Sequence, residues 1–215
     1  MPSSSNFGKL YTAMMLKKLH EAGSIKHVVD FGCGEGTYKN LLDPHCPGTR
    51  WTGVEVWEPY VEQFDLEEKY DRIIVEDCRR VDWSSLGPVD LAIFGDILEH
   101  MIREEAVKVV ERALAHAPLV LISIPVVEFP QEPTGGNPYE EHVKDDWDHY
   151  EVMRTFPGVS AFFIHDHIGV YFLTGNELLN RQVTTLQQVV PKLVRSSHPD
   201  HRMAWGGWQV ENYLQ

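Results

Sequence analysis

Residues 28–36 read Val28-Val29-Asp30-Phe31-Gly32-Cys33-Gly34-Glu35-Gly36, and this stretch decides the fold. An apolar run enters a loop with glycine at alternating positions, and a helical pattern then continues to Leu42. Glycine is needed where a backbone turns sharply or comes close to a ligand. The start of the following helix offers unpaired N–H groups to a polar or anionic ligand. The stretch therefore predicts a strand, a ligand-binding loop and a helix in succession.

The spacing of these glycines argues against two common nucleotide sites. A dinucleotide-binding loop reads Gly-x-Gly-x-x-Gly, but the sixth position here is Thr37, and the third glycine comes one residue early at Gly36. Asp30 also precedes the first glycine by two positions. No Gly-Lys-Ser or Gly-Lys-Thr follows, so a phosphate-binding P-loop is excluded.

Apolar runs alternate with helical patterns on both sides of this loop. The expected strands are residues 27–31, 51–56, 72–75, 89–94 and 119–124, and the main connecting helices are 58–69 and 103–116. Continuous apolar strands separated by helices are typical of a parallel sheet that is covered on both faces. Two later runs, 159–164 and 170–173, are separated by five residues and predict an antiparallel hairpin.

The flanking segments complete the expected domain organisation. Residues 7–22 read as an N-terminal helix, and the first expected domain spans residues 1–175. Within it, residues 126–146 form a long loop rich in proline and glycine, and such loops commonly act as lids. Residues 176–215 are expected to be a C-terminal extension, packed on the domain or at a dimer seam, with one helix that ends before Pro191.

Composition limits the class of protein. The 215 residues are 43% hydrophobic and 24% charged, which suits one globular domain with a sizeable core. The net charge of −13 argues against non-specific binding to nucleic acids or anionic membranes. No run approaches the length of a membrane-spanning helix. Three cysteines without a Cys-x-x-Cys pair exclude a four-cysteine zinc site and favour a cytoplasmic location.

Acidic residues stand where the second and third expected strands end. Glu55 closes the second strand, and Asp77 follows the third. Ligands of open α/β sheets bind at the carboxyl ends of the strands. A carboxylate at Glu55 can accept hydrogen bonds from both hydroxyls of a ribose, and Asp77 can accept one from an adenine amino group. Together with the glycine loop, these residues predict a nucleoside-binding site.

The combination of Asp30-Phe-Gly-Cys-Gly-Glu-Gly36, Glu55, Asp77 and Gly95-Asp-Ile-Leu-Glu-His100 resembles the class I S-adenosylmethionine-dependent methyltransferases. The resemblance covers residues 24–174. It implies a doubly wound α/β fold with a mostly parallel seven-stranded sheet closed by the antiparallel hairpin. It also implies S-adenosyl-L-methionine as the methyl donor and an acceptor that enters beside the long loop.

The resemblance assigns a part of the cofactor to each motif. Asp30 and the glycine loop hold the methionine part, Glu55 binds the ribose, and Gly95 and Asp96 lie beside the sulfonium. Val56 or Trp57 flanks the adenine, while Asp77 and Cys78 contact its edge. The implied cofactor-binding residues are Asp30, Gly32, Cys33, Gly34, Gly36, Glu55, Val56, Asp77, Cys78, Gly95 and Asp96.

The residues after the fourth strand leave three interpretations open. If a helix begins at Asp96, then Asp96, Glu99 and His100 share one face. They would brace the helix, or provide His100 as a general base, or hold a divalent ion as in ubiquinone-pathway and small-RNA O-methyltransferases. His142 on the loop is the second candidate for chemistry. We therefore name His100 and His142 as catalytic candidates and assign no metal ligand.

The function expected from the sequence is S-adenosylmethionine-dependent methylation of a small or medium polar metabolite on oxygen or nitrogen. One alternative is a metal-assisted RNA or nucleotide O-methyltransferase, against which the net charge of −13 speaks. The other is a binding module or partner subunit with this fold and no activity. The expected partners are the small-molecule acceptor and, in a homodimer, a second copy of the chain.

Overall fold

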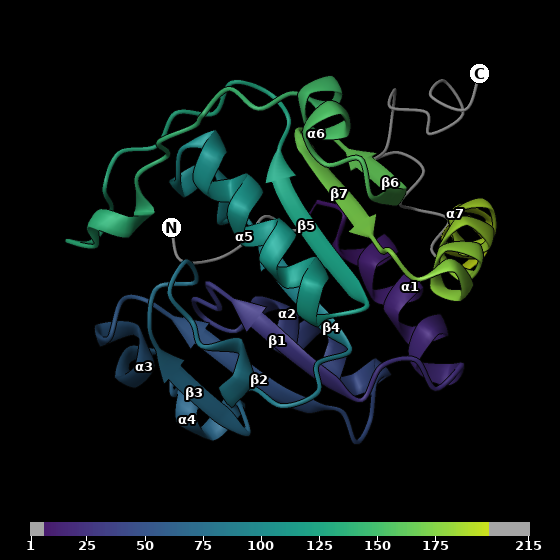
Figure 1. The fold of residues 1–215 in the computed structure, drawn as a ribbon, viewed down its shortest axis with the longest axis horizontal. Helices are drawn as coiled ribbons and strands as arrows, with labels where there is room; N and C mark the ends of the chain where they lie inside the picture. The colour runs from purple at the N-terminus through teal and green to yellow at the C-terminus, as the bar shows by residue number, and fades with distance from the viewer. Residues whose placement is uncertain (1–6, 198–215) are drawn as a thin grey trace.

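The strand order of the sheet is β3-β2-β1-β4-β5-β7-β6 in the computed structural model, which describes residues 7–197 (Figure 1). The strands are β1 His27–Phe31, β2 Arg50–Glu55, β3 Arg72–Val75, β4 Leu91–Gly95, β5 Leu119–Pro125, β6 Val159–His165 and β7 Ile168–Leu173. The first five strands run parallel, and β7 pairs antiparallel with both β5 and β6. The α/β fold with a mostly parallel seven-stranded sheet and a final antiparallel hairpin is confirmed.

The helices connect the strands and cover both faces of the sheet. The α-helices are α1 Lys9–Glu21, α2 Thr37–Leu42, α3 Pro59–Gln63, α4 Leu66–Lys69, α5 Arg103–His116, α6 His149–Thr155 and α7 Glu177–Ser197. Four short 3-10 helices join them: η1 Asp43–His45, η2 Trp83–Ser85, η3 Leu98–His100 and η4 Pro138–Glu140. Within residues 7–197, no helix is both long enough and apolar enough to cross a membrane.

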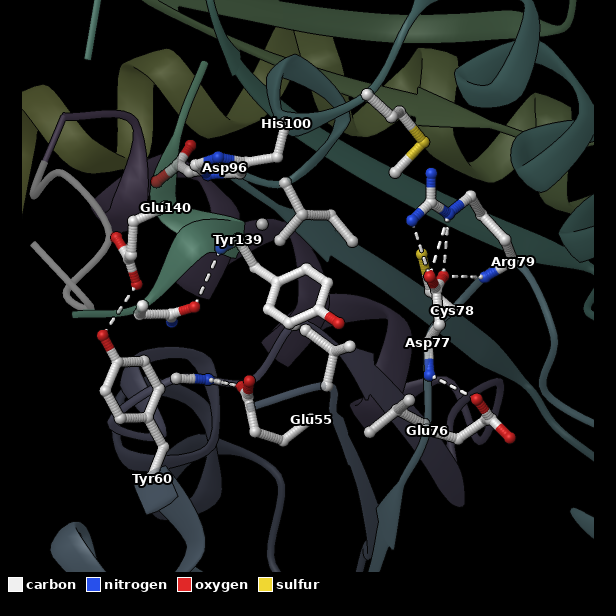
Figure 2. Close-up of a pocket in the computed structure, with 18 residues that line it drawn as sticks. Glu55, Tyr60, Glu76, Asp77, Cys78, Arg79, Asp96, His100, Tyr139 and Glu140 are labelled. Carbon is white, nitrogen blue, oxygen red and sulfur yellow. Dashed lines mark hydrogen bonds and ion pairs between the residues drawn. The ribbon is translucent and has the colours of Figure 1, made fainter. Parts of the chain in front are cut away.

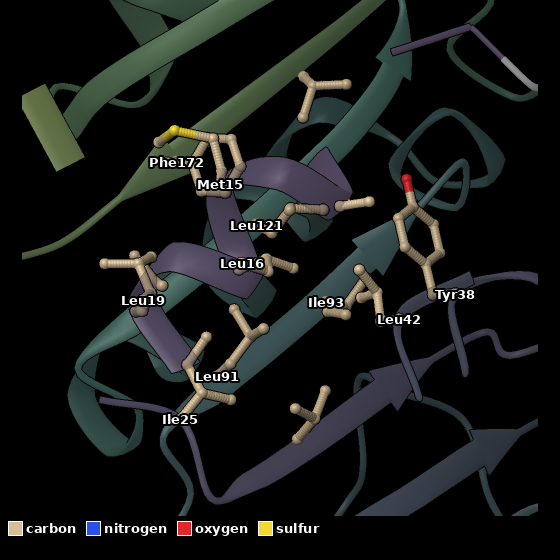
Figure 3. Close-up of a cluster of buried hydrophobic side chains, with 14 of the residues drawn as sticks. Met15, Leu16, Leu19, Ile25, Tyr38, Leu42, Leu91, Ile93, Leu121 and Phe172 are labelled. Carbon is tan, nitrogen blue, oxygen red and sulfur yellow. The ribbon is translucent and has the colours of Figure 1, made fainter. Parts of the chain in front are cut away.

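Neighbouring residues of each central strand face opposite sides of the sheet and supply two separate cores. Leu91 and Ile93 of β4 pack with α1, α2 and α7, as Figure 3 shows for the α1 and α2 side. Ala92 and Phe94 pack with α5 and α6 on the other face. Such alternation explains why the strand sequences are apolar throughout. Burial of these side chains holds the strands in place, and it thereby determines where the carboxyl ends of the strands lie.

The direction of the chain reverses between β1 and β4. After β1 the chain winds outward to β2 and β3, and it then returns to β4 on the other side of β1. Phe31 and Phe94 are paired in register, so the loops that follow these two strands begin side by side. A crevice opens at such a reversal because the two loops lead to opposite faces. The fold thereby places the glycine loop beside Gly95.

Three local expectations from the sequence are wrong. Residues 58–69 form two short helices, because Asp65 between them has φ 51°. The final helix continues past Pro191, since Val194 remains buried in the core shared with α1. No helix begins at Asp96, whose φ is 57°; η3 and α5 follow it instead.

The C-terminal helix α7 packs against α1 and β6, as Figure 1 also shows. Its amphipathic sequence explains this placement, since Val183, Val190 and Val194 are buried in the α1 core. Residues 198–215 of the expected extension, with Trp205, Trp208 and Tyr213, lie outside the described residues.

Candidate functional site

A pocket opens at the carboxyl ends of β1, β2, β3 and β4. It contains about 830 Å³ of empty space, a volume that includes solvent at its open mouth. Loops after all four strands line it, together with part of the long loop after β5 (Figure 2). Its lining residues include Gly32, Gly34, Glu55, Val56, Asp77, Cys78, Gly95, Asp96 and His100. The structure therefore brings most of the predicted cofactor residues to one cavity.

The glycine loop has a backbone shape that suits glycine. Gly32 and Gly34 have φ values of 64° and 50°, in the left-handed region that side chains rarely adopt. A Cβ on Gly32 would also collide with the side chain of Ile97. Both glycines line the pocket, so their missing side chains leave its floor open to a ligand.

Glu55 is buried at the end of β2, and it organises this floor. One carboxylate oxygen accepts the Gly34 N–H at 3.0 Å, and the other accepts the Trp57 N–H at 2.8 Å. Burial raises the pKa of this carboxyl, while those two backbone hydrogen bonds oppose the rise. A carboxylate has about four acceptor positions, so Glu55 keeps capacity for a ligand hydroxyl besides these bonds. Glu55 can thus both tie the glycine loop to β2 and bind a diol.

Asp77 is paired with Arg79, a residue that the sequence reasoning missed. Both oxygens of Asp77 accept hydrogen bonds from the guanidinium, and one also accepts the Arg79 backbone N–H at 2.8 Å. Burial works against the charge of Asp77, but these hydrogen bonds outweigh it and lower the pKa. The carboxylate has no spare acceptor in this arrangement. Contact with an adenine amino group therefore requires Arg79 to shift.

Asp30 lies beneath the loop rather than in the pocket wall. It is buried, and it accepts the hydroxyl of Tyr70 at 2.7 Å. Burial raises the pKa of Asp30 to about 7, against the opposing effects of the Tyr70 hydrogen bond and of nearby Lys9. Asp30 can therefore change its charge near neutral pH.

Lys9 at the start of α1 brings a buried cation to the same region. Its ammonium donates to the Tyr38 hydroxyl at 2.8 Å and lies 3.7 Å from an Asp96 oxygen. Burial works against the charge, but Tyr38, Asp96 and Asp30 outweigh it and raise the pKa of Lys9. Tyr11 of the same helix does not line the pocket, because its ring is buried and stacks on Phe163.

Glu99, His100 and His142 form a cluster next to the pocket. One potential ligand atom from each lies within 4.8 Å of the others, although His142 comes from the long loop. Each imidazole uses Nδ1 to donate to a backbone carbonyl, His100 to Glu141 and His142 to Phe129. In a neutral ring held in this way, Nε2 carries the lone pair. Asp96 is not part of this cluster, so the expected grouping of Asp96 with Glu99 and His100 is replaced by one that includes His142.

The cluster has the chemistry of a cation site or of a proton acceptor. Glu99 is buried, and its Oε2 has no hydrogen-bond partner among the described residues. Burial raises the pKa of Glu99 well above its ordinary value, and nearby Asp96 adds to the rise. A divalent cation would compensate both the buried charge and the unpaired oxygen. Burial lowers the pKa of His100, so its ring is neutral at neutral pH and can accept a proton.

The long loop also reaches the far wall of the pocket. Asn137, Tyr139 and Glu140 line the cavity together with Tyr60 of α3. The Tyr60 hydroxyl donates to a Glu140 oxygen at 3.0 Å, which holds the loop across the cavity (Figure 2). The sequence predicted that this loop lies beside the acceptor, but it did not predict that the loop also lines this wall of the pocket.

Four predicted residues lie outside the lining. Cys33 is buried under the loop, and Gly36 precedes the first residue of α2. Asp30 lies behind Tyr70, and His142 reaches only the adjoining cluster. The lining residues that were not among the predicted site residues are Val54, Tyr60, Glu76, Arg79, Ile97, Met101, Asn137, Tyr139 and Glu140.

Residues 29–122 match the family model of a methyltransferase domain. Among solved structures, the chain is similar to the N-terminal domain of EvdMO1 with SAH bound, at 14% identity and a TM-score of 0.59. That match covers 80% of this chain and 83% of that one. A comparison with curated proteins finds no match.

Two further solved structures are similar over a comparable share of the chain. Small RNA methyltransferase HEN1 is 18% identical with a TM-score of 0.60, covering 80% of this chain and 27% of that one. A S-adenosylmethionine-dependent methyltransferase from Clostridium acetobutylicum ATCC 824 is 10% identical with a TM-score of 0.57, covering 79% and 92%. At these identities the likeness establishes the fold.

Proposed function

We propose that this chain is a class I S-adenosylmethionine-dependent methyltransferase that acts on an oxygen or nitrogen atom of a small or medium polar metabolite, as its match to a methyltransferase domain and its fold support. The position and hydrogen bonds of the Glu55 carboxylate are the observation that supports the cofactor assignment. It is a buried carboxylate at the pocket floor that accepts two backbone N–H groups and keeps acceptor capacity for a ligand. The two hydroxyls of a ribose are suitable donors to such a carboxylate.

The rest of the pocket fits the two ends of S-adenosylmethionine. Val56 and Cys78 provide apolar surface for an adenine between the ends of β2 and β3. Gly95 and Asp96 line the cavity at the end of β4, where the carboxylate of Asp96 favours a nearby positive charge. We assign the sulfonium and the methionine ammonium to this end. The Lys9 ammonium lies 3.7 Å from an Asp96 oxygen, and its positive charge compensates the negative charge of the acidic groups at this end.

Bound S-adenosylmethionine supplies an electrophilic methyl group: an acceptor lone pair forms the new bond to carbon while the carbon–sulfur electron pair returns to sulfur. The chain must hold the acceptor in line with this bond and exclude water. An acceptor hydroxyl or ammonium must also lose a proton. We assign this role to His100, because its ring lines the pocket and its Nδ1–H is fixed on the Glu141 carbonyl. Nε2 then receives the proton.

A second candidate function is methylation of an oxygen acceptor with the help of a divalent cation. The observation in its favour is the cluster of Glu99, His100 and His142, which joins an unpaired buried carboxylate oxygen to two imidazoles. A cation held there would bind acceptor oxygens directly and favour their deprotonated form. Adjacent hydroxyls, as in a catechol or a terminal ribose, are the acceptors that such a cation would bind best.

Direct cation binding separates the two candidates without knowledge of the acceptor. The experiment measures thermal shifts and calorimetric binding of Mg²⁺, Mn²⁺ and Zn²⁺ to metal-stripped protein. Saturable binding that Glu99→Gln and His142→Ala each abolish would support the cation-assisted reaction. His45→Ala is the matched control, because His45 is exposed on η1. If the protein binds none of these ions, His100 remains as the base.

A further inference from the structure

Tyr139 stands in an unusual position for a residue of the long loop. It lies on η4, yet its ring projects into the pocket between Glu55 and the pair of Asp77 and Arg79, as Figure 2 shows. Tyr139 is 43% exposed, whereas Glu55 and Asp77 are buried. An aromatic side chain with this much exposure inside a cavity offers apolar surface to a ligand.

The turn that carries Tyr139 is fixed on both sides. The side chain of Asn137, itself buried, accepts the Tyr139 backbone N–H at 2.9 Å. Glu140 is buried, accepts the Tyr60 hydroxyl, and its carbonyl accepts the side-chain amide of Gln131 at 2.6 Å. The backbone at Tyr139 is therefore held in place, and its ring centroid lies 6.3 Å from that of Trp57. This arrangement presents a ring to the cavity at low entropic cost.

The space next to this ring is the space that a nucleoside would fill. A ribose whose hydroxyls bind Glu55 extends its base toward the ends of β2 and β3, where Val56 and Cys78 line the wall. In Figure 2 the Tyr139 ring lies between Glu55 and Cys78, so a base bound there must contact its face or displace it. Bases stack on aromatic rings, and the contact is favourable for every base because each has a π-face.

We propose that Tyr139 is a cofactor-binding residue, which stacks on the adenine and makes the long loop the outer wall of the nucleoside site. The proposal rests on the proposed function and extends it, because it assigns the loop to the methyl donor as well as to the acceptor. The loop must then open for each exchange of donor for product. Cofactor binding and loop closure are consequently coupled through one side chain.

The experiment compares binding of S-adenosylhomocysteine and of 5′-methylthioadenosine to Tyr139→Ala, Tyr139→Phe and the unmodified protein by calorimetry. Tyr139→Ala should weaken both ligands by the same factor, about tenfold or more, because both contain the base. Tyr139→Phe should bind like the unmodified protein, since it keeps the ring. Tyr150→Ala is the control: Tyr150 is 61% exposed on α6 and does not line the pocket.

Three results would overturn the proposal. Equal or tighter binding by Tyr139→Ala would mean that the ring only blocks the cavity. Weakening confined to S-adenosylhomocysteine would place the contact at the amino-acid end, and equal weakening by Tyr139→Phe would assign it to the hydroxyl. If the unmodified protein binds neither ligand, the proposed function itself fails, which is a distinguishable outcome. Circular dichroism verifies that each variant is folded.

Discussion

Asp30 makes the stability of the folded chain depend on pH in a direction opposite to that of most carboxylates. Its pKa is raised from 3.8 to about 7 because it is buried under the glycine loop. Between these two values the folded state keeps a proton that the unfolded state has released. The stabilising contribution of Asp30 is therefore complete below the unfolded pKa and is lost as the pH rises toward 7.

The perturbation that tests this effect is Asp30→Asn, which removes the titrating group and keeps an oxygen to accept the Tyr70 hydroxyl. Each unit of pKa shift corresponds to about 1.36 kcal/mol, so the full effect is about 4 kcal/mol. The range from about pH 5 to pH 8 contains roughly 2–3 kcal/mol of it. Relative to the unmodified protein, the variant should gain this amount between the two pH values.

Urea unfolding, followed by tryptophan fluorescence at both pH values and without added ligand, measures the difference. The quantity of interest is the stability gap, which is the difference in unfolding free energy between Asp30→Asn and the unmodified protein. The titration of all other groups, apart from those that interact with Asp30, cancels when the gap at one pH is compared with the gap at the other. Asp65→Asn is the control, since Asp65 is exposed on a turn whose positive φ suits asparagine. A gap that is the same at both pH values would refute the argument for a buried, protonated Asp30.

Three other predictions concern the pocket and the loop. Glu55→Ala should weaken S-adenosylhomocysteine by about 2–3 kcal/mol in calorimetry and also lower the unfolding free energy, because the Gly34 and Trp57 N–H groups lose a charged acceptor; unchanged affinity would disprove the ribose assignment. Gly34→Val should weaken binding more than Glu55→Ala does, since valine strongly disfavours a φ of 50°, and calorimetry that ranks the two variants the other way would contradict this. Limited proteolysis should cut first within residues 126–146, and S-adenosylhomocysteine should slow the cleavage; equal rates with and without it would show that the loop does not close over the donor.

The sequence was sufficient to predict features that depend on short segments. The glycine loop, Glu55 and the strand ends follow from apolar runs and special backbone positions, and these signals lie within a few residues of the site. The parallel sheet and its final hairpin follow from the same runs. These expectations agree with the structure because local pattern and tertiary packing favour the same elements.

Features that depend on distant contacts could not be predicted in this way. Tyr139 reaches the pocket only because Glu140 is held by Tyr60, eighty residues away in sequence, and no local signal shows this path. The approach of His142 to Glu99 depends on the same loop. A helix beginning at Asp96 was predicted because its spacing to Glu99 and His100 suits a helix, but the backbone of Asp96 is left-handed. The final helix was predicted to end before Pro191, but burial of Val194 keeps α7 helical beyond it.

Calorimetric titration of the full chain with S-adenosylhomocysteine tests the central claim most directly. The pocket floor formed by Glu55 and the glycine loop predicts one site per chain, with a dissociation constant on the order of 1 μM and a binding free energy of roughly 8 kcal/mol. A thermal shift on addition of the ligand should accompany the heat. Absence of both signals at millimolar ligand would contradict the assignment of this chain as a S-adenosylmethionine-dependent methyltransferase.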